Sequence, residues 1–113
     1  MKFYIAGPIT GHETDYREKF GAAAKILECA GHTVLNPAVL PDGLEYAAYM
    51  RIGFAMLKAC DAIYLLPGWK DSPGAVRELH RAVADHKMIL DHEAIMQFAW
   101  DITPPAGNLE AEA

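Results

Sequence analysis

The sequence predicts a single three-layer α/β domain, with one parallel β-sheet of four or five strands in the order 2-1-3-4 and helices on both faces. Three observations lead to this fold class. Short apolar segments alternate with longer segments whose apolar residues recur at helical spacing. The short segments are almost continuously apolar, as strands covered on both faces are. Right-handed crossovers between such strands give the layout of flavodoxin-like and Rossmann-like folds.

Two strands and two helices are predicted in the first half of the chain. Residues 2–6 are apolar and rich in residues that favour strands. Between residues 15 and 30 apolar side chains recur three and four positions apart, and Gly31 suits the left-handed residue that follows a helix. Residues 33–35 predict the second strand, and the apolar stripe within residues 44–59 predicts the second helix.

The second half of the chain predicts two more strands around a third helix. Residues 61–66 are apolar on both faces after the leading aspartate. A helix over residues 72–86 begins at Ser72, a good N-cap, and Pro73 suits its first position. Residues 87–90 form the fourth predicted strand.

The end of the chain is expected to contribute little to the core. A short helix is predicted over residues 92–100, and the residues after it are rich in proline, glycine and acidic side chains. We therefore place the domain at residues 1–101 and a flexible tail at residues 102–113.

Composition narrows the classes of partner. With 113 residues the chain can bury one hydrophobic core but not two. Its formal net charge of -5 disfavours a nucleic-acid polymer or an anionic membrane as partner. No apolar run approaches the roughly 18 residues of a membrane span, and no leader is recognised, so we expect a cytoplasmic protein.

A ligand pocket is expected at the carboxyl ends of the first and third strands. In open parallel sheets ligands bind there, at the point where the strand order reverses. This rule brings together the loops at residues 7–14, 36–43 and 67–72. In the third loop, Trp69 is placed either to stack on a flat ligand ring or to cover the core.

The helix that begins at Ser72 combines an anion-friendly start with a carboxylate. Gly74 leaves the backbone amides approachable, and helix starts attract anions. Glu78 lies on the first turns, at the edge of an inward stripe that includes Val76 and Val83. A solvated surface glutamate is one interpretation of Glu78. The other is a nucleophile for an anomeric carbon, as in retaining glycosidases.

Several other chemistries lack their sequence patterns. The loop after the first strand has neither the dinucleotide fingerprint nor the phosphate-binding loop with its Gly-Lys-Ser/Thr ending. The five histidines show no metal-ligand spacing, and no serine or cysteine occupies a nucleophile elbow. Carboxylate chemistry on a small ligand remains.

Four segments of the chain resemble the nucleoside 2-deoxyribosyltransferase superfamily, which includes the 2′-deoxynucleoside 5′-monophosphate N-glycosidases. They are YIAGPITG at 4–11, AGHTVLNP at 30–37, CDAIY at 60–64 and SPGAVRE at 72–78. Within the superfamily the chain is most similar to a short phage and bacterial branch of unknown function. The resemblance spans roughly residues 2–91.

The resemblance implies catalytic roles for four residues. Glu78 would attack the anomeric carbon of the deoxyribose, and the hydroxyl of Tyr4 would hold the Glu78 carboxylate in place. Asp61 would help to protonate the departing base, with Asp71 as the competing candidate. Because nucleophile and acid are both side chains, neither a metal nor an organic cofactor is expected.

The resemblance also implies a set of substrate-binding residues. Ser72 and Gly74 would hold a 5′-phosphate near the helix start, although the loop after the first strand has no arginine, where the monophosphate hydrolases tend to carry one. The remaining members of the set line the base side, order a loop or stack on the ligand: Gly7, Pro8, Ile9, Asn36 and Trp69.

These features predict an enzyme that cleaves or exchanges the N-glycosidic bond of a 2′-deoxynucleoside or its 5′-monophosphate through a glycosyl-enzyme intermediate on Glu78. The partner would be a small nucleoside or nucleotide. Because sites of this superfamily are usually shared between subunits, the resemblance also implies a homodimer or a higher homo-oligomer. The alternative is a non-catalytic module that binds a nucleotide in the same pocket, and a weaker one is an interaction domain.

Overall fold

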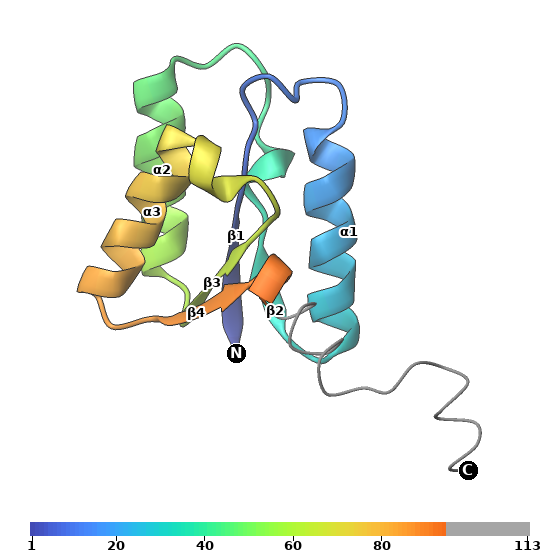
Figure 1. Ribbon diagram of the computed structural model, residues 1–113, viewed down its shortest axis with the longest axis vertical. Helices are drawn as coiled ribbons and strands as arrows, with labels where there is room; N and C mark the ends of the chain where they lie inside the picture. The colour runs from blue at the N-terminus through green and yellow to red at the C-terminus, as the bar shows by residue number, and fades with distance from the viewer. Residues whose placement is uncertain (95–113) are drawn as a thin grey trace.

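A computed structural model describes residues 1–94 as a parallel sheet between two layers of helices (Figure 1). The four strands are hydrogen-bonded in the order β2-β1-β3-β4, and each neighbouring pair is parallel. The predicted fold class and strand order are therefore confirmed. A fifth strand is not present among residues 1–94, and the predicted tail lies outside the described residues.

The helices and strands follow the sequence pattern closely, and their ends differ from the predicted ones by no more than two residues. Two short 3₁₀ turns lie within loops that were expected between these elements. Residues 92–94 are helical, and the rest of the helix predicted over residues 92–100 lies outside the described residues. The elements are β1 Lys2–Ala6, α1 Tyr16–Cys29, β2 Thr33–Leu35, η1 Pro37–Val39, α2 Tyr46–Lys58, β3 Ala62–Leu65, η2 Trp69–Asp71, α3 Pro73–Ala84 and β4 Met88–Asp91.

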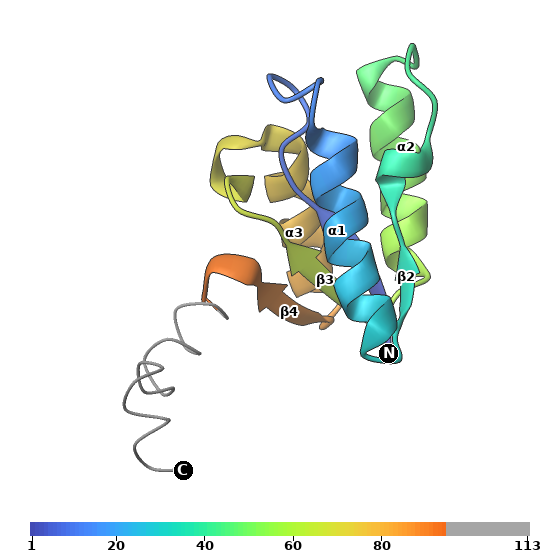
Figure 2. The same ribbon diagram turned by 90° about the vertical axis from the view of Figure 1, so that its right-hand side faces the viewer.

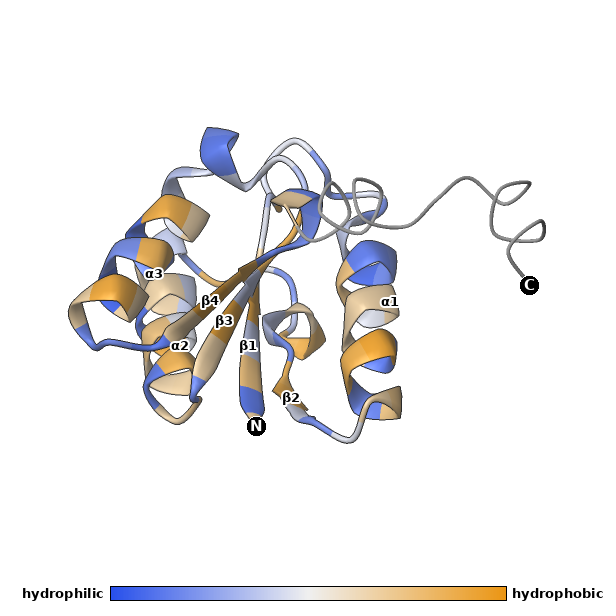
Figure 3. Cartoon of the chain, turned by 60° about the horizontal axis from the view of Figure 1, so that its bottom comes forward, coloured by the Kyte–Doolittle hydropathy of each residue, from blue (hydrophilic) through white to orange (hydrophobic). Residues whose placement is uncertain are grey.

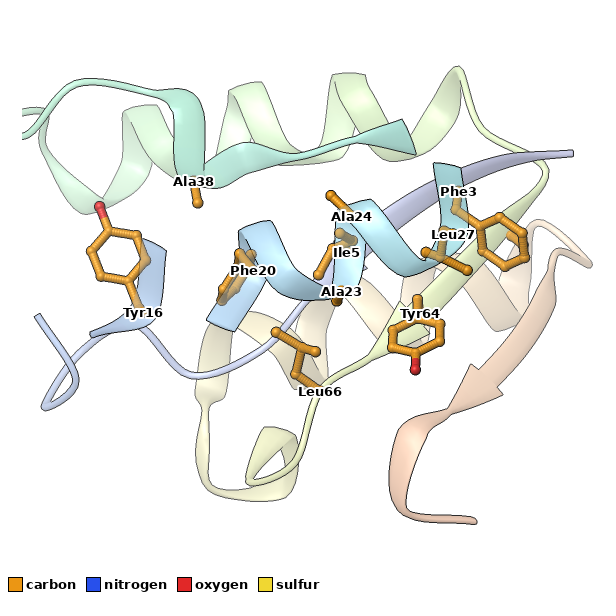
Figure 4. Packing of buried hydrophobic residues seen from close by; sticks show 11 residues of the cluster. Phe3, Ile5, Tyr16, Phe20, Ala23, Ala24, Leu27, Ala38, Tyr64 and Leu66 are labelled. Atoms are coloured by element: carbon orange, nitrogen blue, oxygen red, sulfur yellow. The ribbon is translucent and has the colours of Figure 1, made fainter. Parts of the chain in front are cut away.

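The face of the sheet that α1 covers is apolar. Figures 1 and 2 show α1 alone on this face, with α2 and α3 on the other. Phe3 and Ile5 of β1 point toward α1, because successive strand residues face opposite sides. They pack there with Phe20 and Leu27 of α1 and Tyr64 of β3 (Figure 4). Aromatic and branched side chains thus fill this layer.

The opposite face, beneath α2 and α3, combines large apolar side chains with several alanines. Tyr4 and Ala6, the alternate residues of β1, point toward these helices. The inward side of α3 consists of Ala75, Glu78 and Ala82, which are spaced three and four residues apart. Figure 3 shows apolar residues concentrated on the strands between the helical layers. The second core layer therefore encloses a polar residue, Glu78.

The structure corrects one detail of the predicted α3 stripe. Val83 was expected to point inward, but its side chain is 53% exposed, whereas Ala82 is fully buried. Neighbouring positions on a helix are turned by about 100° from each other, so a stripe centred on Ala82 turns Val83 outward. This rotation of α3 places Glu78 within the buried stripe rather than at its edge.

No helix within residues 1–94 has both the length and the apolar composition needed to cross a bilayer.

Candidate active site

A cavity of about 740 Å³ opens at the carboxyl end of the sheet, the edge where the strand order predicts a pocket. Its size falls in the range of about 300–1,000 Å³ that is typical of small-molecule sites. The end of β1 and the loop after it form one wall, and the starts of α2 and α3 form another. The predicted residues that line it are Tyr4, Gly7, Pro8, Ile9, Asp71, Ser72, Gly74 and Glu78.

Glu78 is the buried polar residue of this cavity. Its side chain is 8% exposed, and its Oε2 accepts a hydrogen bond from the hydroxyl of Tyr4. Burial raises the pKa of Glu78 to about 7, because a charged carboxylate loses solvation there, while the Tyr4 hydrogen bond acts in the opposite direction. A carboxylate with a pKa near neutrality is typical of functional sites.

Tyr4 acts as a fixed hydrogen-bond donor. It lies in the middle of β1, the central strand with β3, and its ring is 1% exposed. Burial raises the pKa of Tyr4 far above its ordinary value, and the nearby Glu78 carboxylate raises it further. The phenol therefore keeps its proton and holds one oxygen of Glu78 in a defined position.

Gly53 of α2 makes room for this pair, and sequence reasoning missed it. A Cβ at position 53 would lie 2.5 Å from Oε2 of Glu78 and 2.7 Å from the hydroxyl of Tyr4. Both distances are shorter than van der Waals contact, so a side chain here would displace the pair. A glycine within an apolar helical stripe was the available indication, because such a residue destabilises a helix by about 1 kcal/mol and usually has a packing reason.

The start of α3 forms the wall next to Glu78. Ser72 caps the helix as predicted, its Oγ accepting from the amide of Ala75 at 3.3 Å, and Pro73 occupies the first helical position. Gly74 also lines the cavity, and a Cβ there would lie 3.3 Å from Sδ of Met50 on α2. Asp71 directly precedes the cap and lines the same wall.

The loop after β1 forms the opposite wall. Gly7 is buried, and a Cβ there would lie 2.9 Å from Cβ of Leu66, so a larger residue would push this loop away from β3. Pro8 and Ile9 continue the wall toward solvent. A ligand in the cavity would therefore lie between this loop and the start of α3.

Asp61 does not reach the cavity. It precedes β3, and its Oδ2 accepts from the backbone amide of Lys2 at 2.9 Å, at the start of β1. In a parallel sheet all strand starts lie at one edge and all strand ends at the other. Asp61 therefore lies at the opposite end of the strands from the cavity, and its position does not fit the predicted role of protonating a leaving base. Asp71, the competing candidate for that role, lines the cavity.

Asn36 and Trp69 also take structural positions outside the cavity lining. Oδ1 of Asn36 accepts from the amide of Ala38 at 2.9 Å and caps η1. The indole Nε1 of Trp69 donates to Oδ2 of Asp91 at 3.2 Å, and the ring packs against the core layer beneath α2 and α3. Of the two interpretations of Trp69, covering the core is the one its packing matches.

Among residues 1–94, no three His, Cys, Asp or Glu side chains come together in an arrangement that could hold a metal ion.

The fold and the cavity define an α/β protein of the Rossmann-like class, with a buried carboxylate at the carboxyl edge of a parallel sheet. Residues 1–91 match the model of a family described as a domain of unknown function, DUF4406. The chain belongs to this family. A search of the curated proteins finds no match.

Among solved structures, the chain is similar to a 2-desoxiribosyltransferase from Leishmania mexicana, with a TM-score of 0.64 and 22% sequence identity. The match covers 80% of this chain and 62% of the other, so this chain spans less than two thirds of the length of that enzyme. The expected resemblance to the nucleoside 2-deoxyribosyltransferase superfamily is thereby confirmed at the level of the fold.

Proposed function

We propose that this protein cleaves or exchanges the N-glycosidic bond of a 2′-deoxynucleoside or its 5′-monophosphate, with Glu78 as the nucleophile. One observation carries the proposal: a buried carboxylate lines a cavity of substrate size and accepts a hydrogen bond from a buried tyrosine. The likeness in fold to a deoxyribosyltransferase supports the same class of reaction.

The two oxygens of Glu78 have different roles in this reaction. Tyr4 holds Oε2, and no side chain or backbone group among residues 1–94 donates to Oε1. Oε1 attacks the anomeric carbon, a C1′–O bond forms, and the C1′–N bond breaks with its electron pair going to the base. The proton that the departing base takes up comes from water in the cavity, which is open to solvent. Water, or a second base in a transferase, releases the sugar from Glu78.

Activity should depend on pH through Glu78, because the nucleophile must be ionised. With a pKa of about 7, the fraction of ionised Glu78 in the free enzyme rises as the pH passes through neutrality. The Tyr4 hydrogen bond lowers this pKa, so Tyr4→Phe should move the acid limb of kcat/KM to higher pH.

The test is chromatography for free base after incubation with each deoxynucleoside and each 5′-monophosphate. Glu78→Gln should lose at least about 10³-fold in rate, because a carboxamide cannot form the intermediate. Lys19→Gln, on an exposed side of α1, is a control that should retain activity. Mass spectrometry of a stalled reaction should find deoxyribose on the peptide that contains Glu78.

Equal rates for wild type and Glu78→Gln would overturn the catalytic assignment. Saturable binding with intact ligand recovered would instead identify the alternative, a module that binds a nucleotide without changing it.

We also propose a homo-oligomer, which the family resemblance implies. Leu44 and Tyr46 line the cavity and are 39% and 50% exposed, so the mouth of the site has apolar surface that a second subunit would cover. Light scattering coupled to gel filtration should give a mass of at least two chains, and a monomer at all concentrations would contradict this.

A further inference from the structure

Acidic side chains outnumber basic ones among the residues that line the cavity, where His12 is the basic residue. Among the described residues that line it there are four carboxylates, Glu13, Asp42, Asp71 and Glu78, and neither a lysine nor an arginine. Sites that bind phosphate groups usually present arginine, lysine or several free backbone amides. The start of α3 at Ser72 suggested a phosphate site, but the side chains that line the cavity do not include the lysine or arginine that such a site usually has.

We propose that this site selects an uncharged deoxynucleoside over its 5′-monophosphate, and that Asp71 is the residue chiefly responsible. The inference rests on the proposed function and decides between the two substrates that this function leaves open.

The start of α3 offers little to a phosphate. Pro73 has no amide proton, and the amide of Ala75 donates to Oγ of Ser72 at 3.3 Å. The amide of Ser72 itself donates to a backbone carbonyl in η2 at 3.0 Å. Within the described residues this leaves the amide of Gly74 as the free donor of the first turn. Asp71, directly before the cap, also lines the cavity.

Two other carboxylates line the cavity, Glu13 and Asp42. Glu13 adds negative charge to the cavity, whereas the charge of Asp42 is compensated by an ion pair. The amide of Gly11 donates to Glu13 at 2.9 Å and lowers the pKa of Glu13 below its ordinary value, so this side chain stays ionised. Asp42 is paired with Nη2 of Arg17 at 3.0 Å. The Arg17 guanidinium also donates to two backbone carbonyls of the loop after β2, so it is held by Asp42 and Leu40 at the margin of the cavity, although Arg17 itself is not a lining residue.

Coulomb's law gives the direction of the selectivity. A 5′-phosphate carries close to two negative charges at neutral pH, and Asp71 and Glu13 repel both. The 5′-hydroxyl of a nucleoside is instead a donor, for which a carboxylate is a strong acceptor. We expect a preference of about tenfold for the nucleoside. Because salt screens exposed charges, the preference should narrow as ionic strength rises.

The experiment measures binding of a deoxynucleoside and its 5′-monophosphate to Glu78→Gln by calorimetry at low and high salt, together with base release by the wild type. We expect tighter binding of the nucleoside, and affinity for the monophosphate that increases with salt. Asp71→Asn should reduce the difference by about tenfold. Asp85→Asn removes the same charge from the far end of α3 and should leave the ratio unchanged.

The outcomes separate this inference from the function on which it rests. Tighter binding of the monophosphate, weakened by salt, would overturn the selectivity while base release from either compound upheld the function. A preference that Asp71→Asn does not alter would remove the role of Asp71. Neither binding nor base release with either compound would overturn both proposals.

Discussion

The two faces of the sheet are packed in different ways, although they share β1. On the α1 face, Phe3 and Ile5 meet aromatic and branched side chains, and every member of the buried cluster is hydrophobic. On the face of α2 and α3, Tyr4 meets Glu78, and Gly53 of α2 leaves room for the pair.

This difference separates the purely hydrophobic packing from the pair that we propose to be catalytic. The α1 face contributes hydrophobic burial, which needs volume and no defined chemistry. The other face also buries large apolar side chains, but it contains a carboxylate and a phenol that are hydrogen-bonded beside a cavity. Substitutions on the first face should therefore change stability alone, whereas substitutions on the second face should also change the protonation or position of Glu78.

The largest expected effect on stability is on the α1 face. Leu27→Ala should lower the free energy of unfolding by roughly 2–5 kcal/mol, because Leu27 is buried among aromatic residues and truncation leaves a cavity. Ile26, the preceding residue, is 60% exposed, so Ile26→Ala should stay within about 0.5 kcal/mol of wild type. Urea denaturation measures both. Similar losses for both variants would contradict the assignment of the buried side of α1.

The pH dependence of stability should report on the other face. Burial raises the pKa of Glu78 from 4.5 to about 7, so the folded state holds this proton more tightly than the unfolded chain does. Its contribution is complete below about pH 4.5, and it is lost as the pH rises through about 7. The loss amounts to about 3 kcal/mol.

Glu78→Gln provides the control for this pH dependence, because a carboxamide does not titrate. Denaturation midpoints at a series of pH values should decline for wild type across this interval and decline less for the variant. Parallel curves would mean that Glu78 is not the group responsible.

A smaller effect is expected from Gly53→Ala. The new methyl group would lie within 2.7 Å of both Glu78 and Tyr4, and overpacking of this kind costs about 1–3 kcal/mol. Gly21→Ala is a matched control within α1, because nothing lies within 4 Å of a Cβ there, and it should stabilise the protein by about 0.5–1 kcal/mol. Opposite signs for the two variants, measured by thermal unfolding, would support the comparison between the faces.

The smallest effect is expected at the helix start. Ser72→Ala removes the cap of α3 and should cost about 1 kcal/mol. Ser72→Asn restores an acceptor at the same position and should recover most of the loss. A Ser72→Ala variant as stable as wild type would show that the cap contributes little.

The fold was predictable because its determinants are local and periodic. Apolar strands, helical stripes and the residues at helix ends are written in consecutive sequence, and right-handed crossovers restrict the topology that joins them. Ser72 caps the start of α3, and Gly31 takes the left-handed conformation after the end of α1, both as the sequence predicts.

The site was predictable only in part, because burial and proximity depend on packing between distant segments. Glu78 is a common helix glutamate until the rotation of α3 turns it inward. Asp61 and Asp71 are equally acidic in the sequence, and only the direction of the strands separates them. Gly53 acquires its role from two side chains on other elements. The burial and the neighbours of these residues depend on tertiary contacts, which the periodicity of the sequence does not contain.

The contact between Tyr4 and Glu78 also bears on how β1 finds its partners during folding. A shift of β1 by one residue would exchange the two faces of the strand, so Phe3 or Ile5 would face α3 and the Tyr4 hydroxyl would enter the apolar layer of α1. The shift would leave a buried carboxylate and a buried phenol each without a partner. The pair that we propose to be catalytic thus also disfavours the wrong strand register.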